Sequence, residues 1–175
     1  MIRLLLPAAA LAAVVPAAAA QAPLPRLENK VLLAGCRQGE CRWLRILALG
    51  RAASVPQGEL RRVSLRSGTS LHPDGRTPRN ARSARIGWEA GTRTDYVFCS
   101  TARPVYAFQN EAGELVTHYL DLYALGGYQL SSGNLYMRLC HDRGLTRRTL
   151  RALGYRPGTR SEQVEHGAAE DLTRF

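Results

Sequence analysis

Segments in which apolar and polar residues alternate recur through the middle of the chain. From Leu60 to Arg66, Val63 and Leu65 fall on one side of the alternation, and arginine and serine residues fall on the other. This period of two predicts a half-buried β-strand. Apolar, β-branched or aromatic runs predict further strands over residues 31–34, 43–47, 85–88, 96–99, 105–108 and 115–120. Together they favour a mainly β fold, a single small antiparallel sandwich or barrel of about seven short strands.

The segments between and after these strands predict a loop, a helix and a tail. Residues 67–83 are rich in Gly, Pro, Ser and Asn and predict a loop. Thr146 and Gly154 suit the two ends of a C-terminal helix over residues 146–153. Residues 135–140 are compatible with a closing strand and equally with the start of a helix. Residues 156–175 are polar and mixed in charge, which predicts a disordered tail after a β domain of residues 21–155.

The first twenty residues have the layout of a secretory signal peptide. A short basic start at residues 1–3 precedes an apolar stretch, and small residues at 18–20 precede Gln21. The stretch is too short and too rich in alanine for a comfortable membrane span, which needs about 20 strongly apolar residues. We therefore expect a periplasmic or secreted protein with no transmembrane segment once residues 1–20 have been removed.

The four cysteines allow three pairings, and their positions favour Cys36–Cys41 together with Cys99–Cys140. The first pair brackets a turn-like segment between two strand-like runs, which suggests a hairpin closed at its tip by a disulfide. A four-cysteine zinc site is the alternative, but such sites use two short Cys-x2-4-Cys pairs and only one such pair exists here. The sequence therefore predicts structural disulfides and neither a metal nor another cofactor.

The chain is strongly basic, with a formal net charge of +10, and Lys30 is its only lysine. A positive charge favours anionic partners, and arginine binds phosphate and carboxylate groups in a bidentate way. Arg76, Arg79, Arg82 and Arg85 stand three residues apart and are the candidate anion-binding residues. The alternative is a solvated loop in a protein whose arginine content reflects GC-rich coding.

Export, positive charge and the lack of a catalytic motif favour a non-enzymatic binding protein. The expected partner is an anionic envelope polymer or glycolipid, and no residue is assigned a catalytic role. Another protein is the alternative partner. The segment Ser131–Tyr136 resembles the serine–glycine–tyrosine stretch of the bacterial lysozyme inhibitors. That resemblance implies a protein-binding inhibitor module, although a basic protein suits the basic lysozymes poorly as partners.

A small secreted nuclease is the third hypothesis. In that chemistry one imidazole accepts a proton from the attacking hydroxyl, another donates one to the leaving oxygen, and a cation holds the phosphate. His118, His141 and Arg103 are the residues available for these roles, and nothing in their spacing demands it.

Overall fold

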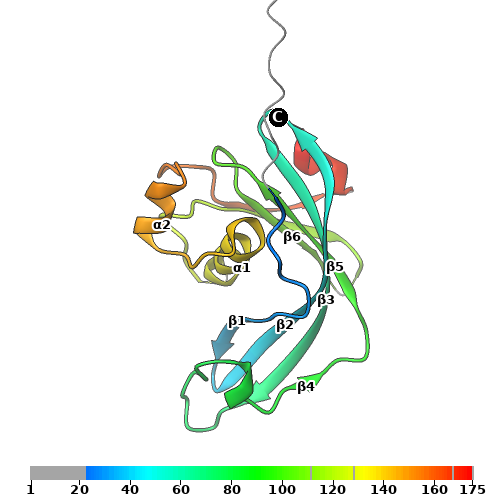
Figure 1. Cartoon of the computed structure of the whole chain (residues 1–175), viewed down its shortest axis with the longest axis vertical. Coiled ribbons are helices and arrows are strands. Elements are labelled where there is room, and N and C mark those ends of the chain that lie inside the picture. The colour runs from blue at the N-terminus through cyan, green and yellow to red at the C-terminus, as the bar shows by residue number, and fades with distance from the viewer. Residues whose placement is uncertain (1–22, 111, 128, 167, 175) are drawn as a thin grey trace, which may run out of the picture.

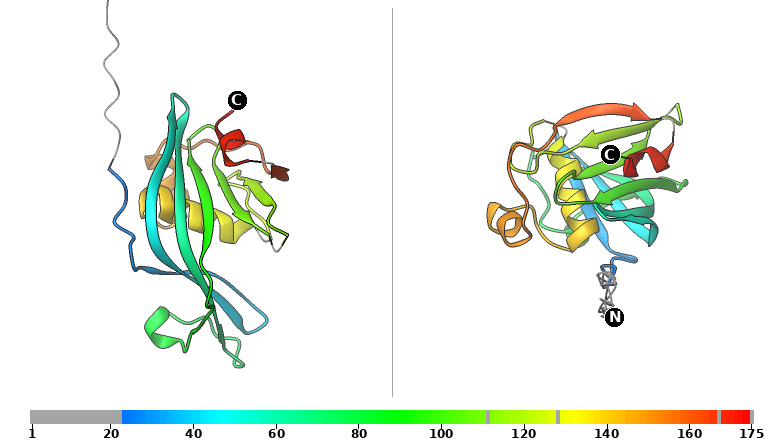
Figure 2. Two further views of the ribbon diagram at one scale, coloured as in Figure 1. Left: turned by 90° about the vertical axis from the view of Figure 1, so that its right-hand side faces the viewer. Right: turned by 90° about the horizontal axis from the view of Figure 1, so that it is seen from above.

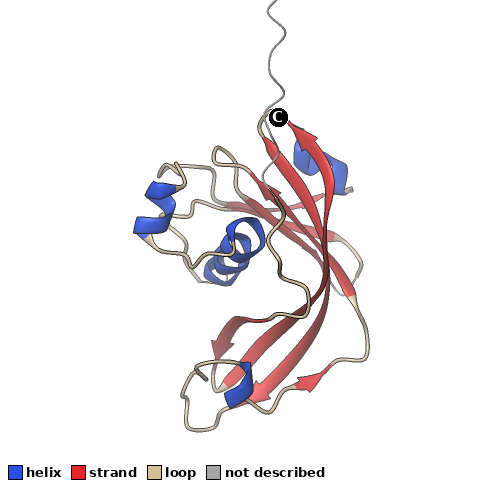
Figure 3. Ribbon diagram, in the orientation of Figure 1, coloured by secondary structure: helices blue, strands red, loops and turns tan. Residues whose placement is uncertain are grey.

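A computed structural model describes residues 23–110, 112–127, 129–166 and 168–174, and it shows one curled antiparallel sheet wrapped partly around a helix (Figures 1 and 3). The strands are β1 Val31–Arg37, β2 Glu40–Val55, β3 Gly58–Leu71, β4 Gly87–Trp88, β5 Arg93–Cys99, β6 Val105–Gln109, β7 Leu115–Tyr119 and β8 Glu162–His166. The helices are α1 Gln129–His141 and α2 Arg147–Ala152, with the short 3-10 helices η1 Ala81–Ser83 and η2 Ala169–Thr173. The prediction of a mainly β, antiparallel fold is confirmed.

The strands follow the order β1-β2-β3-β5-β6-β7-β8, and β4 pairs with one end of β3. Every pairing is antiparallel, and β2 and β3 form a long hairpin that runs the length of the molecule. β1 and β8 lie at the two edges and do not pair with each other. Seen from above, the strands curve around α1 as a half-barrel (Figure 2).

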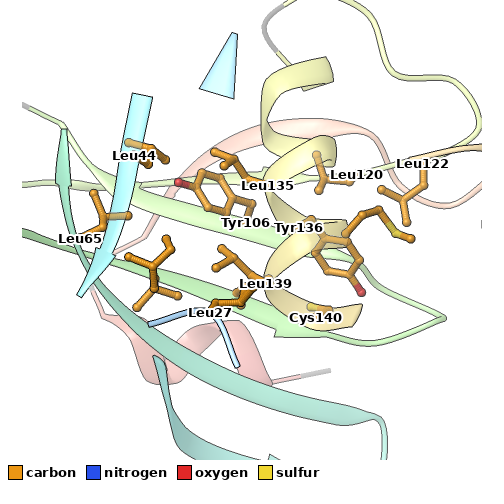
Figure 4. Close-up of a cluster of buried hydrophobic side chains, with 14 of the residues drawn as sticks. Leu27, Leu44, Leu65, Tyr106, Leu120, Leu122, Leu135, Tyr136, Leu139 and Cys140 are labelled. Atoms are coloured by element: carbon orange, nitrogen blue, oxygen red, sulfur yellow. The ribbon is translucent and has the colours of Figure 1, made fainter. Parts of the chain in front are cut away.

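Each face of the sheet has its own core. On the concave face, sheet residues pack against α1 and the N-terminal Leu27, as Figure 4 shows. The labelled residues of this core are Leu27, Leu44, Leu65, Tyr106, Leu120, Leu122, Leu135, Tyr136, Leu139 and Cys140. The convex face is covered near β5–β7 by Leu172 of η2, which is fully buried beside Leu60, Phe98, Val105 and Tyr119. Two covered faces explain why the second half of β5, Tyr96–Cys99, and most of β6 are apolar.

Helix α1 settles the segment that the sequence left open between strand and helix. Leu135, Tyr136, Leu139 and Cys140 are buried at a spacing that fits one side of a helix and would not share one face of a strand. Its C-terminal end is held by the buried guanidinium of Arg61, which donates to the carbonyl oxygens of Leu139 at 2.7 Å and Cys140 at 3.0 Å. A cation at this end also suits the helix dipole.

Both predicted disulfides are present. Cys36–Cys41 crosses the tip of the β1–β2 hairpin, and Cys99–Cys140 joins the end of β5 to the end of α1. Two disulfides are typical of a protein from an oxidising compartment, outside the cell or in the periplasm. No helix in the described ranges has the length and apolarity to cross a membrane. The expected signal peptide, residues 1–20, lies outside the described residues.

The prediction of a disordered tail at residues 156–175 is wrong. Strand β8 pairs with β7 along the sheet edge, and η2 carries Leu172 into the convex core. The physical reason is that an edge strand takes most of its order from backbone hydrogen bonds, so it needs few apolar residues. Here Val164 and Leu172 supply the apolar contacts within an otherwise polar stretch.

The predicted loop at residues 67–83 begins too early, because β3 continues to Leu71. Its polar end is stabilised by side-chain hydrogen bonds: Trp43 Nε1 donates to Ser70 Oγ at 2.7 Å, and Ser70 Oγ lies 2.9 Å from His72 Nε2. Serine and glycine are poor strand formers in isolation, and pairing with β2 overrides that tendency. The predicted C-terminal helix is confirmed as α2, with the Thr146 side chain accepting from Thr149 N.

Candidate ligand-binding cavity

Helix α1 covers only part of the concave face, and a cavity of about 1230 Å³ lies over the rest. Its walls come from the β1–β2 hairpin, the strands β5–β7 and the N-terminal half of α1. The lining residues include Ala34, Arg37, Glu40, Arg42, Leu44, Arg93, Tyr106, Phe108, His118, Ser131, Ser132 and Leu135. The cavity is therefore walled on several sides, and the exposed lining residues Arg37, Glu40 and Arg42 mark its mouth. They belong to the β1–β2 hairpin, which extends beyond α1 (Figure 1).

The strand alternation of β2 gives the cavity both polar and apolar parts. Glu40, Arg42 and Leu44 are two residues apart and lie on the same face. Leu44 is buried beside Tyr106 and Leu135 deep in the cavity, whereas Arg42 is exposed towards its mouth. Arg37 pairs directly with Glu40 across β1 and β2, so its side chain lies on the same face. Charge therefore gathers at the mouth, and apolar surface lies further in.

A third cation, Arg93, is held inside the cavity by a buried carboxylate. Its Nη2 donates to Asp95 Oδ2 at 3.2 Å, and its Nε lies 3.2 Å from Asp95 Oδ1. The Tyr106 hydroxyl also donates to Asp95 Oδ2. Burial outweighs the attraction of Arg93 and raises the pKa of Asp95 above its usual value. Asp95 is fully buried, whereas the Arg93 side chain is 29% exposed, so Arg93 presents the accessible edge of this group.

His118 lies on the inner wall between the sheet and the helix. Its Nδ1 is 2.7 Å from Ser132 Oγ of α1, and its Nε2 is 3.2 Å from Gln163 Oε1 of β8. Burial lowers the pKa of His118, although the hydrogen bond to Gln163 opposes the shift. Both ring nitrogens thus have neutral partners, and the residue joins α1 to the sheet edge.

His141, at the other end of α1, belongs to a separate buried polar group. Its Nε2 lies 2.7 Å from the Tyr155 hydroxyl, which lies 2.8 Å from the Tyr136 hydroxyl. The Tyr136 hydroxyl donates to Ser100 O at 3.0 Å and accepts from Ser100 N at 3.1 Å. The single hydroxyl proton of Tyr136 is used for Ser100 O, so in the next hydrogen bond the Tyr155 hydroxyl donates to Tyr136. The Tyr155 oxygen then accepts from the Nε2–H of His141. Burial, reinforced by the nearby Arg61 charge, lowers the pKa of His141 to about 4.

Stability is expected to fall as the pH is lowered from about 6.5 to about 4. The ordinary pKa of histidine is 6.5 and that of His141 is about 4 in the folded protein, so the unfolded chain binds a proton first across this interval. The lowered pKa of His118 acts in the same direction. Urea unfolding at several pH values measures the slope. His141→Gln removes the titrating group, so its slope should be shallower; an unchanged slope would contradict the assignment to His141.

The candidate anion-binding arginines do not line the cavity. Arg76, Arg79, Arg82 and Arg85 are all exposed on the β3–β4 loop, around η1. This loop packs against the β1–β2 hairpin: His72 N donates to Gly39 O in the turn at 2.6 Å, and η1 lies next to β1 (Figure 1). The four arginines therefore stand at the same end of the molecule as Arg37 and Arg42.

The residues named for a nuclease are not brought together. His118 contacts Ser132 and His141 stands nine residues further along α1, a separation of about 13 Å along the helix axis. The Arg103 side chain points to the convex side, where its Nη2 donates to Leu172 O at 2.6 Å. Each of the three has a structural partner in a different part of the fold.

The segment that resembles the lysozyme inhibitors lies inside α1. Ser132, Gly133, Leu135 and Tyr136 are buried, and a Cβ added at Gly133 would lie 2.1 Å from Leu125 Cδ1. Most of the segment packs against the rest of the protein and presents little surface to a partner.

Comparison with protein families, with curated proteins and with solved structures finds no match to this chain. Within the described ranges, no three His, Cys, Asp or Glu side chains gather in a way that would hold a metal ion. The cavity is therefore interpreted from its own lining.

Sequence reasoning missed Arg37, Arg42, Arg93 and Asp95. One signal was present: Glu40, Arg42, Leu44 and Ile46 alternate with Cys41 and Trp43, so charged and apolar residues share one face of β2. A face that changes from charged to apolar along a strand is typical of a strand that leaves a core and enters a cavity mouth.

Proposed function

We propose that this protein is a non-enzymatic, exported binding protein whose ligand is an anionic amphiphile of the cell envelope. The cavity carries the proposal, because it combines arginines at its mouth with an interior in which apolar side chains lie beside Arg93 and His118. Arg37 and Arg42 would contact the acidic headgroup, and Leu44, Phe108 and Leu135 would contact the hydrocarbon part.

The size and chemistry of the cavity support this ligand class. Pockets for small molecules usually occupy about 300–1,000 Å³, and this cavity, at about 1230 Å³, has room for a longer hydrocarbon chain. Guanidinium groups bind phosphate and carboxylate through paired hydrogen bonds. Glu40 is the one carboxylate among the described lining residues, so cations outnumber anions at the mouth.

The test is titration with decyl phosphate below its micelle concentration, followed by calorimetry. Arg37→Glu/Arg42→Glu should weaken binding at least tenfold, because it replaces attraction at the mouth by repulsion. The matched control is Arg147→Glu/Arg148→Glu, which makes the same charge change on exposed residues of α2. It should leave the affinity within about twofold.

A neutral amphiphile of the same chain length separates the two parts of the site. Decyl maltoside should bind wild type and the Arg37/Arg42 variant equally weakly. Equal losses of decyl phosphate binding in both charge variants would contradict a site at Arg37 and Arg42, as would no binding by wild type.

A further inference from the structure

We propose that the end of the molecule bearing the cavity mouth docks on an anionic phospholipid bilayer. The docking surface consists of Leu71 and the β3–β4 loop arginines Arg76, Arg79, Arg82 and Arg85. This inference rests on the proposed function and deepens it. Docking would place the cavity mouth against the membrane surface that supplies or accepts the amphiphile.

Leu71 is an exposed apolar residue at the outer end of β3, paired with the cavity-lining residue Glu40. Its side chain is 75% exposed, which is the largest exposure among the big hydrophobic residues that the structure describes. In the sheet, Arg37 pairs with Glu40 and Glu40 pairs with Leu71, so these three residues form one row. Directly paired residues share a face, and Arg37 and Glu40 line the cavity. Leu71 therefore stands on the cavity side, at the outer end of the sheet.

The backbone around Leu71 is firmly held. Ser70 is fixed by Trp43 and lies against His72, and His72 N donates to the carbonyl of Gly39 in the β1–β2 turn. The Cys36–Cys41 disulfide closes the same hairpin. The ordered strand end presents the Leu71 side chain with 75% of its surface exposed, so its apolar area is available to a partner.

The loop that follows Leu71 supplies positive charge around it. All four loop arginines are exposed, and the single acidic residue of the loop is Asp74, 3.8 Å from Arg76 Nε. One further carboxylate, Glu40, pairs with Leu71 across β2 and β3. The loop is also ordered: Asn80 Oδ1 accepts from Arg82 N at 3.0 Å and from Ser83 N at 3.2 Å, which caps η1. The cations are thus presented on a defined backbone.

Charge complementarity selects the partner. An anionic bilayer attracts each nearby arginine, and an apolar side chain beside the basic loop gains further by entering the headgroup region. A soluble polyanion would use the arginines and leave Leu71 in water. The pairing of an exposed leucine with four arginines therefore favours a lipid surface.

Vesicle cosedimentation of the full chain tests the proposal, with phosphatidylglycerol–phosphatidylcholine vesicles against pure phosphatidylcholine. Wild type should bind the anionic vesicles, more weakly as salt is raised, and should not bind the neutral ones. Arg76→Glu/Arg79→Glu/Arg82→Glu/Arg85→Glu should reduce binding on the order of a hundredfold. The matched control, Arg147→Glu/Arg148→Glu/Arg151→Glu/Arg156→Glu, carries the same charge change at exposed positions around α2. Its binding should fall much less, since α2 lies away from the β3–β4 loop (Figure 1).

Leu71→Ser distinguishes a bilayer from a soluble polyanion. It should weaken vesicle binding about tenfold by removing apolar contact, and it should leave binding to heparin unchanged. Equal losses in the two quadruple variants, or a Leu71→Ser variant that binds vesicles like wild type, would overturn the docking surface. Heparin binding without vesicle binding would also overturn it and would indicate a soluble polyanion as the partner. Decyl phosphate binding without vesicles tests the cavity separately, so failure of docking and failure of the proposed function are distinguishable.

Discussion

Removal of the Cys99–Cys140 disulfide is expected to lower the free energy of unfolding by about 4 kcal/mol. The bridge closes a loop with a sequence separation of 41 residues, and in the chain-entropy model the cost of that loop falls on the unfolded state. The bridge also ties the last residues of α1 to β5, where Arg61 and Tyr136 hold the same helix end. Chemical unfolding of Cys99→Ala/Cys140→Ala measures the loss, which corresponds to a drop in Tm of about 10 °C.

The matched control is the other disulfide. Cys36–Cys41 has a sequence separation of 5, so Cys36→Ala/Cys41→Ala should cost about 2 kcal/mol in the same model. The ordering of the two double variants is the prediction. A larger loss for the Cys36/Cys41 variant would show that local order at the hairpin tip outweighs loop closure across the fold.

The parts of the fold that the sequence predicts well are the ones with local causes. The strands β6 and β7 follow from the apolar runs at residues 105–108 and 115–120, and α2 follows from Thr146 and Gly154. The pairing of Cys36 with Cys41 follows from the turn between them, and it leaves Cys99 with Cys140.

The parts that it misses depend on distant partners. Helix α1 is stabilised by packing in the half-barrel and by Arg61, which is 78 residues from Leu139. Strand β8 is stabilised by β7, which lies far from it in the sequence. Local composition carries no information about either contact. It therefore leaves residues 135–140 open between strand and helix, and it predicts a tail at residues 156–175.

The candidate site shows the same limit. The arginine spacing at Arg76, Arg79, Arg82 and Arg85 is visible in the sequence, and the structure adds that these residues stand at the mouth end of a cavity. The cavity itself arises because α1 covers one part of the concave face and leaves another open. Arg93 and Arg42 come from β5 and β2, strands that are not neighbours in the sheet, and no sequence spacing relates them.

Asp95→Asn is expected to destabilise the protein by roughly 3 kcal/mol, because it leaves the Arg93 charge in the cavity without its counter-ion. The Tyr106 hydroxyl would keep an acceptor in the new side chain, so the loss arises mainly from Arg93. The partial exposure of Arg93 keeps the cost at the lower end of the range for buried pairs. Urea unfolding measures it. Glu114→Gln, which removes one negative charge from an exposed loop residue, is the control and should change stability by less than about 0.5 kcal/mol.

The same substitution should change ligand binding in the opposite direction. Asp95 neutralises Arg93 in the cavity, so Asp95→Asn gives the site one more uncompensated positive charge, and decyl phosphate should bind several-fold more tightly to the folded variant. The Arg93 cation in the cavity does not improve stability by itself, because it needs a buried counter-ion. In an anion-binding cavity the same cation attracts the ligand. If the folded Asp95→Asn variant bound decyl phosphate more weakly than wild type, Asp95 would serve to orient Arg93 for the ligand. If Glu114→Gln also bound decyl phosphate more tightly, the net charge of the protein alone would set the affinity. Tighter binding confined to Asp95→Asn, together with lower stability, would identify Arg93 as part of the binding site.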